Sequence, residues 1–317
     1  MEPTTRSAPA VTTATRAPIA TPTEVVGRPV SRAFLMLFVA GVVAAVVVGL
    51  AAYVVSSRWP SNVAPATWPS SVVAPPPGDG PPPPVGPESA DASWNMVFSD
   101  EFDGASLDTS RWTDRSSAEA DEGRGNKGNQ QLEWNQGENC RVSGGELVMT
   151  AMRQTHTSAA GERYEWTSCL ISSAPSFAFQ YGYLEERAIL PAANGFWPAF
   201  WTWQAPQVDK QVETDVYEQY SAGSRELHMT QHSGRRDGCQ WRPPFDPSAD
   251  WHTYAVAIEP SGTTWYVDGV RICHTGATSD APTNVISNLG VYAERPPASA
   301  TDRADKRVDY IRAWART

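Results

Sequence analysis

The chain has 317 residues, a formal net charge of −10 at pH 7 and 13 tryptophans. Residues 1–91 contain five arginines and five carboxylates, so the net negative charge lies entirely in residues 92–317. An acidic domain repels phosphate groups, which argues against a nucleic acid partner and leaves a neutral polysaccharide acceptable. Eleven of the tryptophans also lie in this C-terminal part. These flat, apolar side chains suit stacking on sugar rings, and packing in a core is their alternative use.

The N-terminal segment predicts a membrane anchor. Residues 1–32 are rich in Thr, Ala and Pro and predict a disordered cytoplasmic tail. Ala33–Val55 is an uncharged apolar run, long enough to cross a bilayer as one transmembrane helix. Arg28 and Arg32 precede this run and a lone Arg58 follows it, which favours a single-pass cell-membrane protein with a cytoplasmic N-terminus and an extracytoplasmic C-terminal domain. The alternative is a cleaved signal peptide and a secreted domain.

Residues 56–92 predict a Pro-rich linker, because eleven prolines lie between Pro60 and Pro87. Proline fixes φ and lacks an N–H, so this stretch is expected to be an extended polyproline spacer. It could hold a domain away from the membrane or serve as a passive connection.

Residues 93–317 predict a single all-β domain. Gly, Pro, Asn and Asp separate many short strand-like runs, and helical periodicity is scarce. Asp268-Gly269 and Gly144-Gly145 are expected to form hairpin turns. Short strands at this spacing favour a sandwich or a barrel. Clear examples of the predicted strands are residues 146–151, 254–258, 264–267 and 307–312.

All four cysteines lie in this domain. Outside the cytoplasm, two disulfides are expected. Four cysteines allow three pairings, of which Cys140–Cys169 with Cys239–Cys273 is favoured because it joins neighbouring segments. Free buried thiols are the alternative, and the spacing does not match a C-x-x-C zinc site.

Three carboxylates lie within six residues, at Glu213, Asp215 and Glu218. Side chains alternate along a strand, so Glu213 and Asp215 share one face. In a regular strand, Glu218 would point to the opposite face. A β-bulge around Val216-Tyr217 would return Glu218 to that face. A structural protein would gain nothing from three acids on one face, because like charges repel each other. An enzyme, in contrast, would gain a pair of carboxyl groups with separated pKa values.

In a catalytic interpretation, ionised Glu213 attacks a sugar C1 atom and protonated Glu218 acts as general acid, while Asp215 hydrogen-bonds the nucleophile. Retaining glycosidases hold such carboxyl groups about 5–5.5 Å apart. A solvated acidic strand or a cation site is the alternative. The segment Asn194–Trp203, with three tryptophans just upstream, favours sugar stacking beside the acids.

The hexamer Glu213–Glu218 (ETDVYE) resembles the E-x-D-x-x-E signature of glycoside hydrolase family 16, the laminarinase-like enzymes. Further motifs follow the family order over the whole of residues 93–317, and the ordered set is far more specific than the hexamer. They are Phe98–Gly104 (F-S-D-E-F-x-G), Tyr181–Arg187 with Leu190-Pro191 (Y-G-R-F-E-A-R…L-P), Phe196–Trp201 (L-W-P-A-F-W), Trp251–Tyr254 with Trp265–Gly269 (F-H-x-Y…W-Y-V-D-G) and Val308–Arg312 (V-D-Y-V-R).

The resemblance implies a jelly-roll β-sandwich with a concave substrate cleft, and an endo-acting, retaining hydrolase of β-linked glucans or galactans. It assigns the nucleophile to Glu213, its helper to Asp215 and the acid/base to Glu218. Catalysis requires no cofactor, and a structural Ca²⁺ is expected on the convex side. By matching position, the substrate-binding residues are Trp197, Trp201, His228, Asn129 and Arg187, and the calcium ligands are Glu101, the Gly145 carbonyl and Asp309. Structural roles are the alternative for His228 and for Arg187, the latter as an ion pair.

Three departures from the family pattern bear on substrate choice. Tyr183 stands where relatives often have arginine, Gln130–Glu133 replaces the N-E-x-Q order, and Asn288–Glu294 lacks a double glycine. A retaining β-glycanase, a non-catalytic polysaccharide-binding module and a transglycosylase are the competing functions, and the intact carboxylate triad argues against the binding module. β-1,3-Glucan is the favoured substrate, with mixed-linkage glucan and galactans left open. A monomer is expected.

Overall fold

The computed structural model describes residues 94–316. The predicted tail (1–32), transmembrane helix (33–55) and Pro-rich linker (56–92) lie outside the described residues. Within residues 94–316, no helix is long and apolar enough to cross a membrane.

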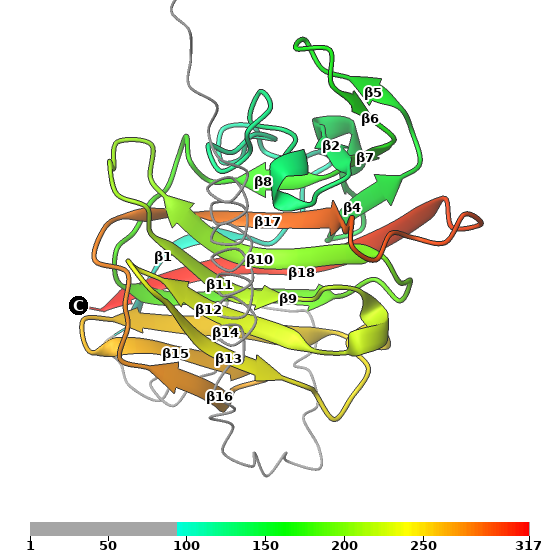
Figure 1. The fold of residues 1–317 in the computed structure, drawn as a ribbon. Coiled ribbons are helices and arrows are strands. Elements are labelled where there is room, and N and C mark those ends of the chain that lie inside the picture. The colour runs from blue at the N-terminus through cyan, green and yellow to red at the C-terminus, as the bar shows by residue number, and fades with distance from the viewer. Residues whose placement is uncertain (1–93, 317) are drawn as a thin grey trace, which may run out of the picture. The chain divides into compact units, whose positions relative to one another are not determined.

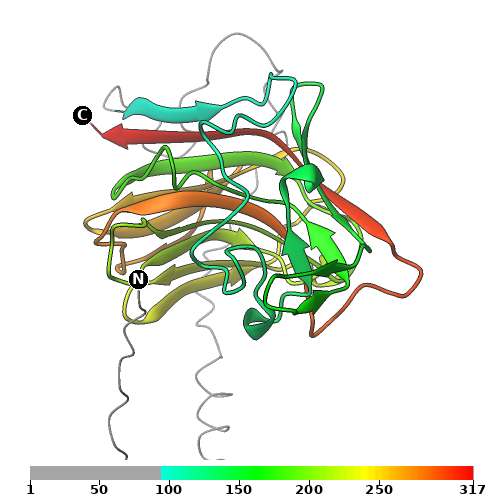
Figure 2. The same ribbon diagram turned by 90° about the horizontal axis from the view of Figure 1, so that it is seen from above.

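Two β-sheets lie face to face and form the body of the domain (Figures 1 and 2). The six-stranded sheet has the order β13-β12-β11-β10-β17-β8. The ten-stranded sheet has the path β16-β15-β14-β9-β18-β4-β7-β2, with β1 added beside β18 and β3 beside β4. Among the described strands, all pairings are antiparallel except that of β2 with β7. The predicted all-β sandwich is confirmed.

The strands of the six-stranded sheet are β8 (Leu170–Ser172), β10 (Phe196–Gln204), β11 (Glu213–Glu218), β12 (Leu227–His232), β13 (Arg236–Trp241) and β17 (Thr283–Val291). Those of the ten-stranded sheet are β1 (Trp94–Asp100), β2 (Glu133–Asn135), β3 (Cys140–Val142), β4 (Leu147–Met152), β7 (Trp166–Ser168), β9 (Gly182–Ile189), β14 (His252–Glu259), β15 (Gly262–Val267), β16 (Val270–Thr275) and β18 (Arg303–Arg316). The remaining described elements are the hairpin of β5 (His156–Thr157) with β6 (Arg163–Tyr164) and the 3-10 turns η2 (Lys127–Asn129), η3 (Gly137–Asn139) and η4 (Ala222–Ser224).

The period-two alternation of a strand decides which side chains fill the space between the sheets. On β10, Phe196 and Phe200 are fully buried in the main hydrophobic core. Trp197 and Trp201, one position further along, belong to a separate cluster on the outer face of the same strand. The six-stranded sheet therefore has an aliphatic and aromatic inner face and an outer face rich in tryptophan.

Both predicted hairpin turns are confirmed. Asp268 and Gly269 join β15 to β16 with φ values of 47° and 75°, the positive values that a two-residue turn of this kind requires. Gly144 and Gly145 lie between β3 and β4 with φ values of 71° and 78°.

Both favoured disulfides, Cys140–Cys169 and Cys239–Cys273, are present. Cys239 lies on β13 and Cys273 on β16, and each of these strands forms one edge of its sheet. The second disulfide therefore joins the two sheets covalently at one edge of the sandwich.

Replacing Cys239 and Cys273 together by serine is expected to lower the free energy of unfolding by roughly 3–4 kcal/mol. The reason is that the bond restricts the unfolded chain across a sequence separation of 34 residues. Urea denaturation of the parent and the variant without reductant measures the difference. Equal midpoints and slopes for the two proteins would contradict this expectation.

Candidate active site

Strand β11 carries an irregularity at the position where the sequence predicts a bulge. Phe200 of β10 is paired with Tyr217, whereas the next residue, Trp201, is paired with Asp215. Val216 is therefore the extra residue, and the pairing with β12 shifts over the same stretch. The predicted β-bulge is confirmed.

The bulge sets the direction of every side chain that comes after it in the strand. Val216 and Tyr217 are consecutive, yet both lie in the main core between the sheets. Because two successive residues face inward, Glu218 returns to the outer face shared by Glu213 and Asp215. A regular strand would have turned the Glu218 carboxyl toward the other sheet.

An indole from the facing sheet supports the backbone at the bulge. Trp265 on β15 is fully buried, and its Nε1 donates a hydrogen bond of 2.7 Å to the Asp215 carbonyl. A buried carbonyl without a partner destabilises the fold, so this bond offsets the disruption of the strand ladder.

On the outer face, a histidine joins the first two acids. Glu213, Asp215 and His232 each offer a ligand atom within 4.8 Å of the others. His232 Nε2 lies 3.1 Å from Asp215 Oδ2, and His232 is the β12 partner of Glu213. His232 was not among the residues predicted from the sequence. Its spacing of four residues from His228, which places both on one face of a strand, is the signal that could have found it.

The Glu218 carboxylate has two donors, and both bind one oxygen. Trp197 Nε1 lies 3.2 Å and the Tyr220 hydroxyl 2.8 Å from Glu218 Oε1. His228, predicted to face the substrate, is the β12 partner of Glu218 and packs edge-on against Tyr220. Its Nδ1 lies 3.3 Å from Gln240 Nε2.

The pKa values of all three acids are raised. Burial, followed by the charge of Asp215, raises the pKa of Glu213 to about 9. Burial and the charge of Glu218 raise the pKa of Asp215, and burial raises the pKa of Glu218. Three negative charges in one poorly solvated place oppose each other, so the free site favours retention of protons.

Two groups on neighbouring strands modify these charges. Arg236 on β13, the partner of His232 in the sheet, lowers the pKa values of Asp215 and Glu218 through its positive charge. Burial lowers the pKa of His232, and it lowers that of His228 to about 4. Both imidazoles are therefore neutral at pH 7.

The predicted stacking residues Trp197 and Trp201 lie on the same outer face but are largely covered, with exposures of 8% and 9%. Tyr220 and Tyr292 pack against Trp197 at ring-centroid distances of 4.6 and 5.6 Å. Trp203 packs edge-on against Trp201. These three neighbours are only half-buried, so they offer more open ring surface than the two tryptophans that the sequence indicated.

Asn129 is exposed at the end of η2. Its neighbour Gln130 accepts a hydrogen bond of 2.9 Å from the Ala293 amide, next to Tyr292. The Asn129 loop therefore lies near Trp197, on the outer face of the six-stranded sheet that also carries the three acids. Its role in binding stays a prediction.

Arg187 does not join the other predicted substrate residues. It lies on β9 of the ten-stranded sheet, where its Nη1 is 2.5 Å from Asp309 Oδ2 and its guanidinium packs 5.2 Å from the Trp251 ring. The three acids of β11 lie on the other sheet. The observed contacts of Arg187 are those of the alternative structural ion pair, and its role in substrate binding stays a prediction.

The side chains predicted to bind calcium are already paired with arginines. Arg312 donates two hydrogen bonds to the Glu101 carboxylate, at 2.9 and 2.6 Å, and Arg187 occupies Asp309. Each carboxylate thus has a guanidinium as its counter-charge. Both carboxylates are therefore engaged by arginines, and a calcium site that they form with the Gly145 carbonyl stays a prediction.

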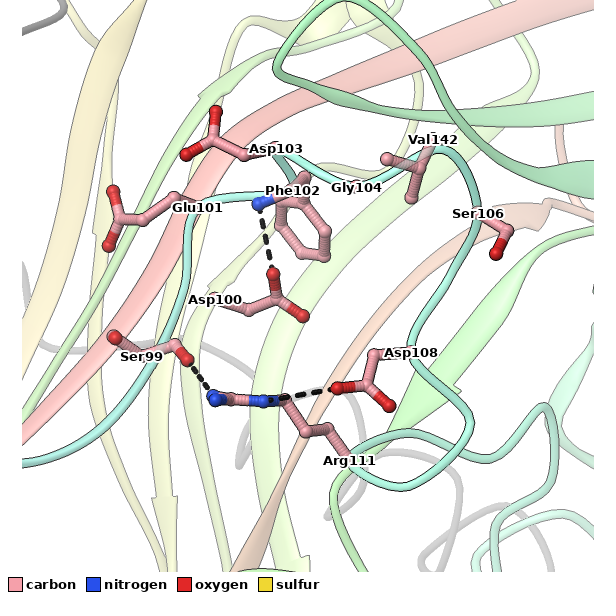
Figure 3. Close-up of a pocket in the computed structure, with 10 residues that line it drawn as sticks. All are labelled: Ser99, Asp100, Glu101, Phe102, Asp103, Gly104, Ser106, Asp108, Arg111 and Val142. Atoms are coloured by element: carbon pink, nitrogen blue, oxygen red, sulfur yellow. Dashed lines mark hydrogen bonds and ion pairs between the residues drawn. The ribbon is translucent and has the colours of Figure 1, made fainter.

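Glu101 instead lies at the edge of a surface hollow of about 340 Å³, shown in Figure 3. Within it, Asp100 accepts a hydrogen bond from the Phe102 amide, and Arg111 bonds to both Ser99 and Asp108. None of the three β11 acids lines this hollow, so it is distinct from the candidate active site.

A second pair of buried acids, absent from the sequence-based predictions, supports the Trp197 end of the site. Glu133 on β2 is completely buried, and its Oε2 accepts the Val291 amide at 2.7 Å. Burial raises the pKa of Glu133 to about 8 and that of Glu119 to about 7. Glu133 is the last residue of Gln130–Glu133, the segment that replaces the family's N-E-x-Q order. It stands where that pattern has glutamine.

Replacing Glu133 with glutamine is expected to remove a pH dependence of stability. A carboxyl with a raised folded-state pKa holds its proton more tightly in the folded protein, so its stabilising contribution is complete below pH 4 and is lost as the pH rises toward 8. Glu133→Gln should therefore raise the free energy of unfolding at pH 8 by roughly 1–3 kcal/mol and change it little at pH 4.

Urea denaturation between pH 4 and pH 8 measures this effect. The exposed Glu138→Gln variant is the matched control and should follow the parent protein throughout. If Glu133→Gln keeps the pH slope of the parent, the carboxyl is not the group responsible.

Three carboxyl groups on one strand, with neutral histidines and aromatic rings around them, form a site of the glycosidase type on an antiparallel β-sandwich. The sequence model of Glycosyl hydrolases family 16 matches residues 126–312. This chain belongs to that family, and the resemblance seen in its motifs is confirmed.

Individual relatives agree with this assignment. A β-glucanase of Rhodothermus marinus is 31% identical over 192 residues, which cover 55% of this chain and 63% of the relative. A glucan endo-1,3-β-glucosidase A1 of Niallia circulans is 28% identical over 268 residues, covering 72% and 39%. The chain thus spans less than two thirds of the length of these curated relatives.

Solved structures show the same fold. The catalytic domain of an endo-1,3-β-glucanase (laminarinase) from Thermotoga petrophila superposes with a TM-score of 0.64 at 27% identity, covering 71% of this chain and 98% of that domain. The endo-β-1,3-glucanase from Pyrococcus furiosus gives a TM-score of 0.63 at 26% identity, covering 71% and 95%. The sandwich is therefore of the jelly-roll type of this family.

Proposed function

We propose that the domain is an endo-acting, retaining glycoside hydrolase that cleaves a β-linked glucan, with β-1,3-glucan as its first substrate. The observation that carries this proposal is the bulge at Val216, which gives Glu218 the same face as Glu213 and Asp215. The relatives named as endo-1,3-β-glucanases support the choice of glucan.

The reaction proceeds by double displacement. Glu213 attacks the anomeric carbon while Glu218 gives its proton to the departing glycosidic oxygen, which releases one part of the polymer as an alcohol. Water then attacks the glycosyl–Glu213 ester, with Glu218 now accepting a proton from that water. The second inversion restores the original anomeric configuration.

The hydrogen bonds of Glu218 indicate which of its oxygens carries the proton. Trp197 and Tyr220 both donate to Oε1, which therefore acts as an acceptor. Oε2 is left to hold the proton that passes to the leaving oxygen. A neutral Glu218 also decreases the negative charge that Glu213 and Asp215 experience.

Nucleophilic attack requires an ionised Glu213, although its raised pKa favours the protonated form in the free site. Carboxylate oxygens of Glu213 and Asp215 lie within 4.8 Å of each other, and the charge of Asp215 helps to keep a proton on Glu213. Transfer of that proton to Asp215 ionises the nucleophile without any proton leaving the site. His232, whose Nε2 is 3.1 Å from Asp215 Oδ2, orients the aspartic acid for this exchange.

Glu213→Gln and Glu218→Gln should each abolish or strongly reduce release of oligosaccharides from laminarin-type β-1,3-glucan. Loss of the general acid alone is expected to cost about 10²–10⁴-fold in kcat. Reducing-end assays on β-1,3-glucan, mixed-linkage glucan and galactans measure the rate. Proton NMR of the first products should show retention of the β configuration.

Glu138→Gln, an exposed change of the same chemical kind, is the control and should leave the rate unchanged. If the parent protein binds these polymers and cleaves none of them, the domain is a polysaccharide-binding module. If sugar passes mainly to added acceptor oligosaccharides, it is a transglycosylase.

We further propose that the domain functions outside the cytoplasm, held at the membrane through residues 33–55. Two disulfides support an oxidising compartment. Protease added to intact cells should release the C-terminal domain. A domain that is cut after lysis, but not in intact cells, would place it on the cytoplasmic side.

A further inference from the structure

A charged pair lies between the two sheets, directly behind the bulge. Lys306 on β18 and Glu186 on β9 have completely buried side chains, with Nζ and Oε2 3.1 Å apart. Lys306 Nζ also donates to the Ala199 carbonyl at 2.9 Å and to Ser287 Oγ at 2.8 Å. The three protons of the ammonium group therefore have three acceptors.

The Glu186 carboxylate is equally well bonded. Its Oε2 accepts the Tyr217 hydroxyl at 2.7 Å, and its Oε1 accepts the Ser287 hydroxyl at 2.6 Å. A buried ion pair is weak evidence for stability, because apolar residues of similar size often serve a fold as well. The family pattern Y-G-R-F-E-A-R has alanine where this chain has Glu186, so the sandwich itself does not require the charge.

The bonds of this pair converge on the general acid. Tyr217 immediately precedes Glu218 in the chain, and Ala199 is the β10 partner of Glu218 in the sheet. The network therefore holds the backbone on the C-terminal side of the bulge, while Trp265 holds the Asp215 carbonyl on the other side.

We propose that Lys306 and Glu186 are positioning residues, which fix Tyr217 and so set the place of Glu218 relative to Glu213. This inference rests on the proposed hydrolase function. An extra residue leaves the local ladder disrupted, so contacts from the facing sheet help to fix the geometry of this bulge. Such anchoring matters for rate, because a misplacement of about 1 Å can cost 10²-fold.

The test compares two variants that each remove one buried hydroxyl. Tyr217→Phe removes the bond to Glu186 and keeps the ring. Tyr254→Phe is the matched control, because the Tyr254 ring packs 4.5 Å from that of Tyr217 and its hydroxyl has no hydrogen-bond partner among residues 94–316. We expect Tyr217→Phe to lower kcat on β-1,3-glucan about ten- to a hundredfold with little change in KM, and to shift the alkaline limb of its pH profile. Tyr254→Phe should resemble the parent.

A double variant distinguishes an effect on the placement of Glu218 from an effect on the stability of the fold. Glu186→Met with Lys306→Met replaces the pair by apolar side chains of similar size, which should preserve the fold. A folded double variant with the same loss of kcat supports the inference. The inference would be overturned if Tyr217→Phe and the double variant both fold and both keep the kcat and the pH profile of the parent protein.

Amide hydrogen exchange of β11 provides a readout that does not depend on activity. Exchange should be faster at residues 215–218 in Tyr217→Phe than in Tyr254→Phe, and equal exchange in the two variants would overturn the inference. If the parent protein cleaves no glycan, the proposed function fails, and the exchange comparison still decides whether the charged pair holds the bulge.

Discussion

One extra residue in β11 is the constraint on which the site depends. Val216 shifts the pairing with both neighbouring strands. As a result, odd-numbered residues (Glu213, Asp215) face outward before it, and the even-numbered Glu218 faces outward after it. The cost is a disturbed ladder and several carboxyl groups removed from water. Contacts from the facing sheet offset this cost, through an indole on one side of Val216 and a buried ion pair on the other. The packing of β11 against the facing sheet therefore also fixes the positions of the acids on its outer face.

Much of this could be predicted from sequence, because the signals were local. Alternation of side chains with period two indicates a strand wherever it occurs, and Asp268-Gly269 indicates its turn from the backbone conformation that glycine permits. The bulge was also predictable. Only a change of register could give Glu218 the face of Glu213, and that arrangement had a chemical purpose. The disulfide pairing followed from the proximity of segments along the chain.

The remaining features depend on contacts between distant segments. His232 and Arg236 reach the acids only because β12 and β13 pair next to β11, which no short motif reveals. Arg187 on β9 and Glu101 just after β1 were placed correctly in their motifs, but a motif does not reveal the partner on a neighbouring strand. In each case the partner is a residue more than 100 positions away, and it determines whether the side chain is available for a ligand.

The Cys239–Cys273 bond also has a consequence for the unpaired margins of the two sheets. β13 and β16 are edge strands of their sheets, and an edge strand can pair with a strand of another molecule. Joining these strands across the sandwich restrains both from peeling away, and charged residues at the start of β13 make that border a poor template. The same covalent bridge that limits the unfolded chain therefore counters edge-to-edge aggregation at an edge beside which residues 94–316 provide no further strand.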